Sequence, residues 1–228
     1  MNMRVRLLLK DLFVYSGIKP SYLISAINGC FEFGQWIKNH PCEAVFRKRE
    51  ELYSYLNDTL LRAISIDYLE FGVYKGDSLR RWSSINKNPS SRFFGFDSFK
   101  GFTEDWKGVW STSPKNTFDT HGKIPEFKDQ RVRLIPGYFQ STLQNFLADY
   151  TPQKMLIVNL DADIYSATLF VLTSLARILI PGTILIFDEF NLICHEFRAF
   201  QDFTKSFCIN YRTLASFNRY ECVAFAIL

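Results

Sequence analysis

The sequence lacks the patterns that define several large classes of protein. Its five cysteines show no CxxC or other metal-ligand spacing, and their odd number does not suggest a disulfide framework. We therefore expect reduced thiols and a cytoplasmic protein. No apolar run reaches the length of a membrane span, because Pro181 and Gly182 interrupt the stretch 178–187. The net charge is only +4 and no run of Lys or Arg occurs, so nucleic acid is not an expected partner.

Two further shortages concern cleavage signals and histidine. The basic, leucine-rich segment 1–10 has no small-residue cleavage site, so we do not interpret it as a signal peptide, and a weak association with a membrane surface stays open for it. Histidine occurs only at His40, His121 and His195. The last two are candidate general bases, but a lone histidine is more often a structural or surface residue.

Apolar periodicity predicts strands that alternate with helices. Apolar residues recur at spacings of seven and four between Val45 and Ile64, which predicts an amphipathic helix over 43–64. Further helices are expected at 77–85, 141–150, 166–179 and 197–207. Strands are expected at 66–71, 92–96, 131–135, 155–160 and 183–187, with a final edge strand at 219–228. This alternation predicts an α/β fold: a Rossmann-like, doubly wound, mostly parallel sheet of about seven strands with helices on both faces.

The predicted organisation is one compact unit with an N-terminal cap. We expect residues 1–64 to form a helical cap or lid, and residues 65–228 to form the ligand-binding domain. Residues 100–130 carry Gly, Pro, Trp and charges without periodicity, which predicts a long loop that helps to cover the ligand. The aromatic N-terminal region also leaves a homodimer open.

Four of the predicted strands end in acidic residues or in a glycine turn flanked by one. These strand ends are Glu70-Phe-Gly72, Asp97, Asp161-Ala-Asp163 and Asp188-Glu189. Strands often end in polar residues, so each case alone has a plain structural explanation. Because ligands bind beyond the carboxyl ends of parallel strands, we expect all four groups to converge on one ligand site.

The segment 70–78 predicts a turn that approaches a ligand closely. Gly72 and Gly76 let the backbone come near the ligand, while the spacing differs from GxGxxG and argues against a dinucleotide. Glu70, just before the first glycine, suits a cationic ligand such as a sulfonium or an amino group. Lys75 could contact a carboxylate, although a solvated surface role is more common. A purely structural turn is the other interpretation.

The remaining carboxylates predict a ribose contact and a cation site. Asp97 can accept hydrogen bonds from both hydroxyls of a ribose, or it can cap the following turn. The carboxylates at 161, 163, 188 and 189 would repel one another unless a cation joined them, and oxygen ligands favour Mg²⁺, Mn²⁺ or Ca²⁺. The other interpretation is that one of them holds the ligand's amino group or caps a helix.

Five longer motifs occur in order over about residues 66–200. They are Glu70-Phe-Gly-Val-Tyr-Lys-Gly76-Asp-Ser78, Gly95-Phe-Asp97-Ser-Phe-Lys-Gly101-Phe, Gly137-Tyr-Phe139-Gln-Ser-Thr142-Leu, Leu160-Asp161-Ala-Asp163-Ile-Tyr165-Ser-Ala-Thr168 and Pro181-Gly182-Thr-Ile-Leu-Ile-Phe-Asp188-Glu189-Phe190. Together they resemble the motifs of the macrocin-type O-methyltransferases. The resemblance implies S-adenosylmethionine as cofactor, bound by Glu70, Gly72, Val73, Gly76, Ser78, Asp97, Ser98, Phe99, Tyr138 and Phe139. It also implies that Asp161, Asp188 and Glu189 hold Mg²⁺, and that Asp161 or Asp163 takes the proton of the acceptor hydroxyl.

The chain departs from the family pattern at two places. Glu189 stands where the family usually has a second aspartate, so it keeps the charge but reaches one methylene further. Pro181-Gly182-Thr183 replaces the usual pair of glycines before the fifth strand. The first departure bears on the metal ligands, whereas the second concerns only a turn.

The leading hypothesis is therefore an O-methyltransferase that uses S-adenosylmethionine and a divalent metal. Its partner would be a small-molecule hydroxyl acceptor, such as a sugar or another natural product. The alternative is a Rossmann-like protein that binds S-adenosylmethionine or a nucleotide without transferring a group. An NAD-dependent enzyme is disfavoured, because the GxGxxG fingerprint is missing and Glu70 is acidic.

Overall fold

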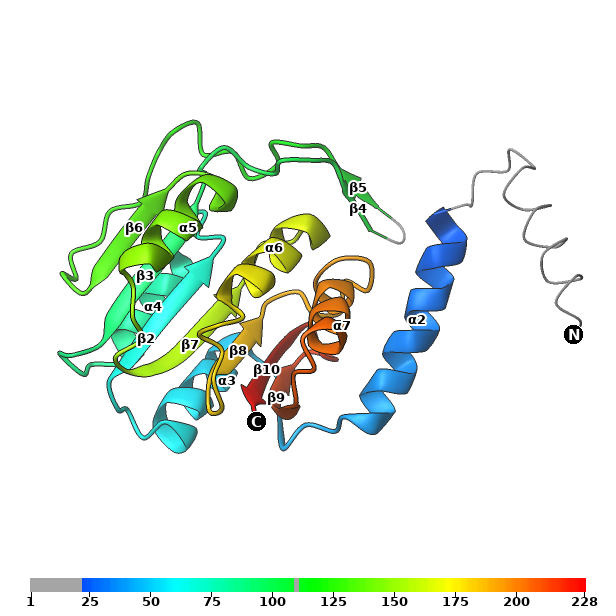
Figure 1. Cartoon of the computed structure of the whole chain (residues 1–228), viewed down its shortest axis with the longest axis horizontal. Helices are drawn as coiled ribbons and strands as arrows, with labels where there is room; N and C mark the ends of the chain where they lie inside the picture. Colours follow the sequence, from blue (N-terminus) through cyan, green and yellow to red (C-terminus); the bar gives the residue numbers. More distant parts are fainter. Residues whose placement is uncertain (1–21, 109–110) are drawn as a thin grey trace, which may run out of the picture.

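The computed structural model describes residues 22–108 and 111–228, and its centre is an eight-stranded sheet between two layers of helices (Figure 1). The strand order is β1-β9-β10-β8-β7-β2-β3-β6. The strands are β1 Ala44–Phe46, β2 Ile66–Phe71, β3 Arg92–Asp97, β6 Val132–Pro136, β7 Met155–Leu160, β8 Ile184–Phe187, β9 Tyr211–Phe217 and β10 Cys222–Ile227. All pairs among β6, β3, β2, β7 and β8 are parallel, which confirms the predicted doubly wound fold.

Helices cover both faces of the sheet because its central strands are apolar on both sides. One face packs against α2 Tyr22–Asn39, α5 Phe139–Asp149, α6 Tyr165–Leu175 and α7 Glu196–Ser206. The other packs against α3 Arg49–Ser54, the π-helix η1 Tyr55–Leu60 and α4 Asp77–Ile85. Successive side chains of a strand point to opposite faces, so Tyr68 joins the core on the α4 side and Leu69 the core on the α6 side.

The predicted continuous helix over 43–64 is too long at both ends, because helical structure runs only from Arg49 to Leu60. Its first residues form β1, which pairs in parallel with β9, and helical structure begins only at Arg49. Val45, which the periodic pattern placed on the buried face, is 68% exposed, whereas Leu52 and Leu56 are buried. The strand pairing gives the backbone of 44–46 hydrogen-bond partners, and this outweighs the local pattern.

The C-terminal part of the sheet also differs from the prediction. β9 was not expected, and β10 is not an edge strand, because it pairs antiparallel with β9 on one side and with β8 on the other. Because β1 and β9 were both unexpected, the sheet has eight strands rather than the predicted number of about seven.

The predicted loop 100–130 contains a short hairpin. Its strands are β4 Trp106–Lys107 and β5 Thr112–Ser113, and the residues between them include the two that the structure does not describe. The hairpin reaches out beyond the sheet towards α2 in Figure 1. The rest of the loop lacks regular strands among its described residues, as predicted.

The N-terminal region is anchored by aromatic packing. Trp36 of α2 lies against Phe190 and Phe197, and its indole N–H donates a hydrogen bond of 2.8 Å to Tyr211 Oη. Helix α2 therefore rests beside α7, and β1 belongs to the main sheet. The basic segment 1–10 lies outside the described residues, and the role of 1–64 as a cap stays a prediction.

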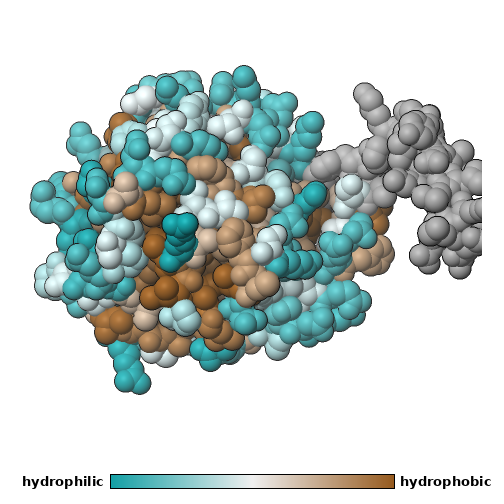
Figure 2. All heavy atoms as spheres, viewed as in Figure 1, coloured by the Kyte–Doolittle hydropathy of each residue, from teal (hydrophilic) through white to brown (hydrophobic). Residues whose placement is uncertain are grey.

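Hydrophobic side chains gather in the middle of the face shown in Figure 2, and hydrophilic ones dominate its rim. No helix within the described residues has the length and apolar character needed to cross a bilayer. The five cysteines are all unpaired.

Candidate functional site

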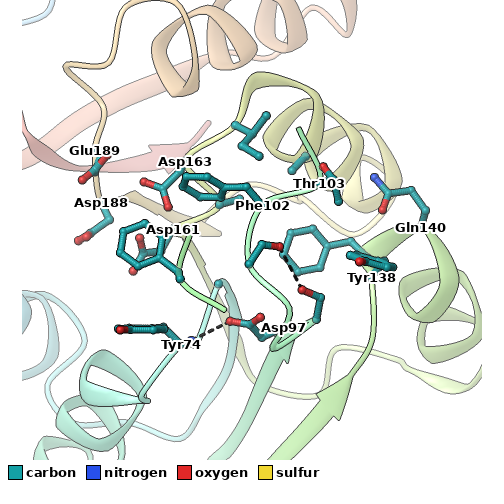
Figure 3. Close-up of a pocket in the computed structure, with 18 of the residues that line it drawn as sticks. Tyr74, Asp97, Phe102, Thr103, Tyr138, Gln140, Asp161, Asp163, Asp188 and Glu189 are labelled. Atoms are coloured by element: carbon teal, nitrogen blue, oxygen red, sulfur yellow. Dashed lines mark hydrogen bonds between the residues drawn. The ribbon is translucent and has the colours of Figure 1, made fainter. Parts of the chain in front are cut away.

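A cavity of about 320 Å³ lies beyond the carboxyl ends of the parallel strands (Figure 3). It is lined by Arg49, Gly72, Tyr74, Asp97, Ser98, Gly101, Phe102, Thr103, Phe118, Tyr138, Phe139, Gln140, Asp161, Ala162, Asp163, Ile164, Ala167, Asp188 and Glu189. Figure 3 shows four carboxylates gathered at one end, Tyr138 and Gln140 at the other, and Asp97 between them. The cavity thus has an acidic end and a polar, aromatic end.

The strand register explains why the acidic residues meet. Phe71 pairs with Phe96 on one side and with Leu160 on the other, and Leu160 pairs with Phe187. Because these parallel strands end level with one another, the residue that follows each of them reaches the same edge of the sheet. The expected convergence of the acidic groups after β3, β7 and β8 is therefore present.

Gly72 makes the close approach of two loops at this edge possible. Its φ is +97°, and a Cβ placed there would lie 1.8 Å from the carbonyl oxygen of Asp161. Only glycine combines this backbone conformation with that distance. The first glycine of the predicted cofactor loop consequently fixes the loop after β2 against the loop after β7.

Asp97 holds the glycine loop with both carboxylate oxygens. Its Oδ2 accepts hydrogen bonds from the backbone N–H groups of Val73 and Tyr74, at 2.8 and 2.7 Å. Its Oδ1 accepts one from Phe99 N–H at 2.7 Å, which is the turn cap considered as an alternative. These bonds leave about one of four acceptor positions of the carboxylate for a ligand.

Glu70 lies beneath the cofactor loop instead of lining the cavity. It is fully buried, and its oxygens accept hydrogen bonds from Tyr68 Oη at 2.6 Å and Ser78 Oγ at 2.7 Å. Burial raises the pKa of this carboxyl to about 7, against the hydrogen bonds that lower it. Both of its oxygens are therefore engaged within the protein. A direct contact between Glu70 and the cofactor stays a prediction.

The other predicted cofactor residues divide into two groups. Gly72, Asp97, Ser98, Tyr138 and Phe139 line the cavity. Val73, Gly76, Ser78 and Phe99 do not line it and instead shape the loops around it.

Three non-glycine residues at or beside the cavity have left-handed backbone. Phe99 is buried with a φ of +55°. Tyr74 and Asp163, which line the cavity, have φ values of +49° and +57°. Left-handed backbone at non-glycine residues is costly and clusters at functional sites.

The acidic end of the cavity is electrostatically crowded. Burial, followed by the negative charge of Asp188, raises the pKa of Asp161. Burial, followed by the negative charge of Glu189, raises the pKa of Asp163. Burial raises the pKa of Asp188 to about 6. Each shift means that the charged form lacks sufficient compensation in this arrangement.

Arg49 supplies positive charge to this end from the start of α3. Its Nη2 lies 3.0 Å from Asp188 Oδ2. No three His, Cys, Asp or Glu side chains of the described residues are grouped so as to hold a metal ion. Among the predicted metal ligands, Asp188 is paired with Arg49 in this arrangement.

Residues 69–190 match the sequence profile of a family described as methyltransferase domain. The chain belongs to this methyltransferase family. A curated relative, 8-demethyl-8-(2,3-dimethoxy-alpha-L-rhamnosyl)-tetracenomycin-C 4'-O-methyltransferase of Streptomyces olivaceus, is 26% identical over 167 residues. The match covers 64% of this chain and 61% of the relative, which is less than two thirds of the relative's length.

Two solved structures share the fold of this methyltransferase. The O-methyltransferase NovP aligns with a TM-score of 0.58 and 19% identity, over 78% of each chain. An O-methyltransferase from Bacillus cereus in complex with SAH (S-adenosylhomocysteine) aligns with a TM-score of 0.52 and 14% identity, over 96% of each chain. At these identities the likeness establishes the fold alone.

His195 of the methyltransferase is a structural residue and not a free base. Its Nδ1 accepts a hydrogen bond of 3.3 Å from Tyr165 N–H, and its Nε2 lies 2.9 Å from the carbonyl oxygen of Lys107, to which it donates. Trp106 stacks on its ring at 5.3 Å. Burial lowers the pKa of His195, in agreement with a neutral ring. The side chain therefore ties the β4–β5 hairpin to the beginning of α6.

Sequence reasoning missed part of the cavity lining. Gln140 lay within a quoted motif but carried no predicted role. Three aromatic residues of the lining were also missed: the ring of Phe118 lies 5.2 Å from that of Tyr74 and 5.3 Å from that of Phe102, between ring centroids. Arg49 was missed because it lay inside the expected amphipathic helix over 43–64 and carried no predicted role. No sequence signal distinguishes it from the other basic residues nearby.

Proposed function

We propose that this methyltransferase transfers the methyl group of S-adenosylmethionine to a hydroxyl oxygen of a sugar or another natural product, assisted by a divalent metal. The observation that carries the proposal is the cavity itself. It joins the Asp97 loop to a cluster of carboxylates at the carboxyl edge of a methyltransferase-family sheet. The curated relative is named for methylation at an oxygen of a rhamnosyl-bearing tetracenomycin, and a structure of the same fold holds SAH.

The cofactor would occupy the cavity from its aromatic end. Asp97, with its remaining acceptor position, would bind a ribose hydroxyl, and Tyr138 and Phe139 would flank the adenine. Gly72 would let the methionine end pass close to the loop backbone. Glu70 would support that loop from below through its bond to Ser78.

The acidic end fits a divalent cation by its chemistry. Its donors are carboxylate oxygens, which Mg²⁺ and Mn²⁺ prefer. Asp188 Oδ1 is buried and has no hydrogen-bond partner among the described residues. Asp161, Asp188 and Glu189 would hold the ion, with Arg49 drawn away from Asp188. When bound, such a cation lowers the pKa of an acceptor hydroxyl and orients its oxygen.

The chain's own residues would complete the transfer. Asp161 or Asp163 would take the proton of the acceptor hydroxyl, because both line the cavity beside the carboxylates to which the metal is assigned. The acceptor oxygen would attack the methyl carbon as the carbon–sulfur bond breaks, and the bonding pair would leave with sulfur. The products would be the methyl ether and S-adenosylhomocysteine.

The deciding experiment is isothermal titration of the protein with SAH in Mg²⁺ and then in EDTA. Binding by the wild type and by Asp188→Ala, but not by Asp97→Ala, is the expected result. A search among sugar acceptors for methyl transfer would follow. Binding of SAH without transfer to any acceptor would favour a binding protein without transferase activity, whereas binding of NAD instead of SAH would overturn the proposal.

A further inference from the structure

We propose that Arg49 is a resident cation at the acidic end of the cavity, which a divalent metal must displace from Asp188. The side chain would then set how tightly the cluster binds metal. This inference rests on the proposed function, because it concerns the carboxylates to which the metal is assigned there. It adds a residue that the family motifs do not contain.

The contact between Arg49 and Asp188 is incomplete. A guanidinium and a carboxylate can form two parallel hydrogen bonds, but only Nη2 and Oδ2 are in contact here, at 3.0 Å. Asp188 Oδ1 and Arg49 Nε are both buried, and neither has a hydrogen-bond partner among the described residues. An arrangement that leaves two buried polar atoms unpaired is easier to displace than a fully satisfied pair.

The two side chains also differ in their freedom to move. The Asp188 side chain is 7% exposed at the end of β8, whereas that of Arg49 is 35% exposed at the first turn of α3. Arg49 can therefore turn towards solvent while Asp188 stays in place. The carboxylate is the fixed ligand, and the arginine is the exchangeable cation.

The surrounding charges make exchange favourable. Arg49 brings one positive charge to a cavity end that also holds Asp161, Asp163 and Glu189. A divalent ion would supply twice the charge and contact more than one carboxylate at once. Competition of this kind lowers the apparent metal affinity by the fraction of molecules in which Arg49 occupies the site.

The experiment measures the binding of Mn²⁺ by electron paramagnetic resonance in three proteins. They are the wild type, Arg49→Gln, and Arg212→Gln, in which an exposed arginine that pairs with Glu43 outside the cavity is removed. We expect Arg49→Gln to bind Mn²⁺ roughly 10-fold more tightly than the wild type. Arg212→Gln should bind Mn²⁺ with the affinity of the wild type. Equal affinity in Arg49→Gln and the wild type would overturn the inference.

A second measurement separates displacement from simple charge repulsion and uses only the wild type. Modification of arginine by phenylglyoxal, followed by peptide mass spectrometry, reports how accessible Arg49 is. Saturating Mn²⁺ should increase the modification of Arg49 several-fold and leave Arg212 unchanged. No increase would mean that the ion pair persists, and the inference would fail. Titration of the same samples with SAH tests the proposed function separately, so a failure of either can be recognised.

Discussion

Both ends of the cavity carry carboxylates, but those carboxylates differ in how far the surrounding protein compensates their charge. At the end where we propose that the ribose binds (the ribose end), the carboxylate of Asp97 accepts three backbone hydrogen bonds and so joins two loops. At the acidic end, Asp161, Asp163 and Asp188 have raised pKa values, and one buried oxygen of Asp188 has no partner among the described residues. The first end is held together by hydrogen bonds within the protein, whereas the second carries negative charge that its surroundings compensate only in part. We therefore call the Asp97 end the rigid half of the cavity and the end with Asp161, Asp163 and Asp188 the adjustable half.

The largest expected effect comes from breaking the rigid half at Gly72. The added methyl group of Gly72→Ala meets the Asp161 carbonyl and adopts an unfavourable φ, so we expect a loss of at least about 3 kcal/mol in the free energy of unfolding. SAH binding should be lost as well. Urea unfolding and titration calorimetry measure the two effects.

Gly182→Ala is the matched control for this variant. Gly182 has a similar φ of +95°, but nothing lies within 4 Å of an added Cβ. It should cost only the backbone strain, about 1–2 kcal/mol. Equal losses in the two variants would show that the contact with Asp161 is unimportant.

The next effect concerns the adjustable half and its base. Asp161→Asn keeps the shape of the side chain but removes its ability to take a proton, so kcat should fall by about 10²–10⁴-fold. SAH affinity should change little, because the ribose end is intact. Parallel kinetics of Asp163→Asn identify which aspartate acts. A normal kcat in both variants would exclude this pair as the base.

A pH experiment tests the carboxyl group beneath the rigid half. The pKa of Glu70 is about 7 in the folded protein and near 4.5 in the unfolded chain, so the folded state holds an extra proton between these values. Stability from this group is complete below pH 4.5 and is lost as the pH rises through 7. The wild type should therefore lose about 2–3 kcal/mol more than Glu70→Gln between pH 5 and pH 8. Urea unfolding at both pH values measures the difference, and parallel losses would contradict it.

The smallest effect is expected at the β4–β5 hairpin, which His195 joins to the beginning of α6. His195→Phe keeps a ring beside Trp106 but loses the hydrogen bonds to Tyr165 and Lys107. We expect KM for the acceptor to rise by about 3–10-fold with SAH affinity unchanged, since a less ordered hairpin positions the acceptor poorly. His121→Phe, at an exposed loop position, is the control. A change in SAH affinity with an unchanged KM for the acceptor would contradict this role of the hairpin.

The sequence was most informative where short motifs and strong periodicity coincide. The five central parallel strands and the acidic residues that follow them could be predicted, because buried strands are continuous apolar runs and strand ends share one edge. β1 could not, since its pairing with β9 joins residues far apart in the sequence, such as Ala44 and Ala215. β9 pairs locally with β10, but its polar residues Arg212, Thr213 and Ser216 leave no continuous apolar run. The ion pair of Arg49 with Asp188 was unpredictable for the same reason as β1. The position of Glu70 below the loop followed from the orientation of one side chain, which a motif does not specify.

The placement of β1 has a practical consequence for dividing this chain. A truncated protein that begins at residue 65, as the predicted domain boundary suggests, would lose β1 and α3 together. β9 would then present an unpaired edge, which is a template for aggregation, and Asp188 would lose its arginine. Poor solubility of such a fragment would report on a damaged sheet edge and would carry no information about the cofactor.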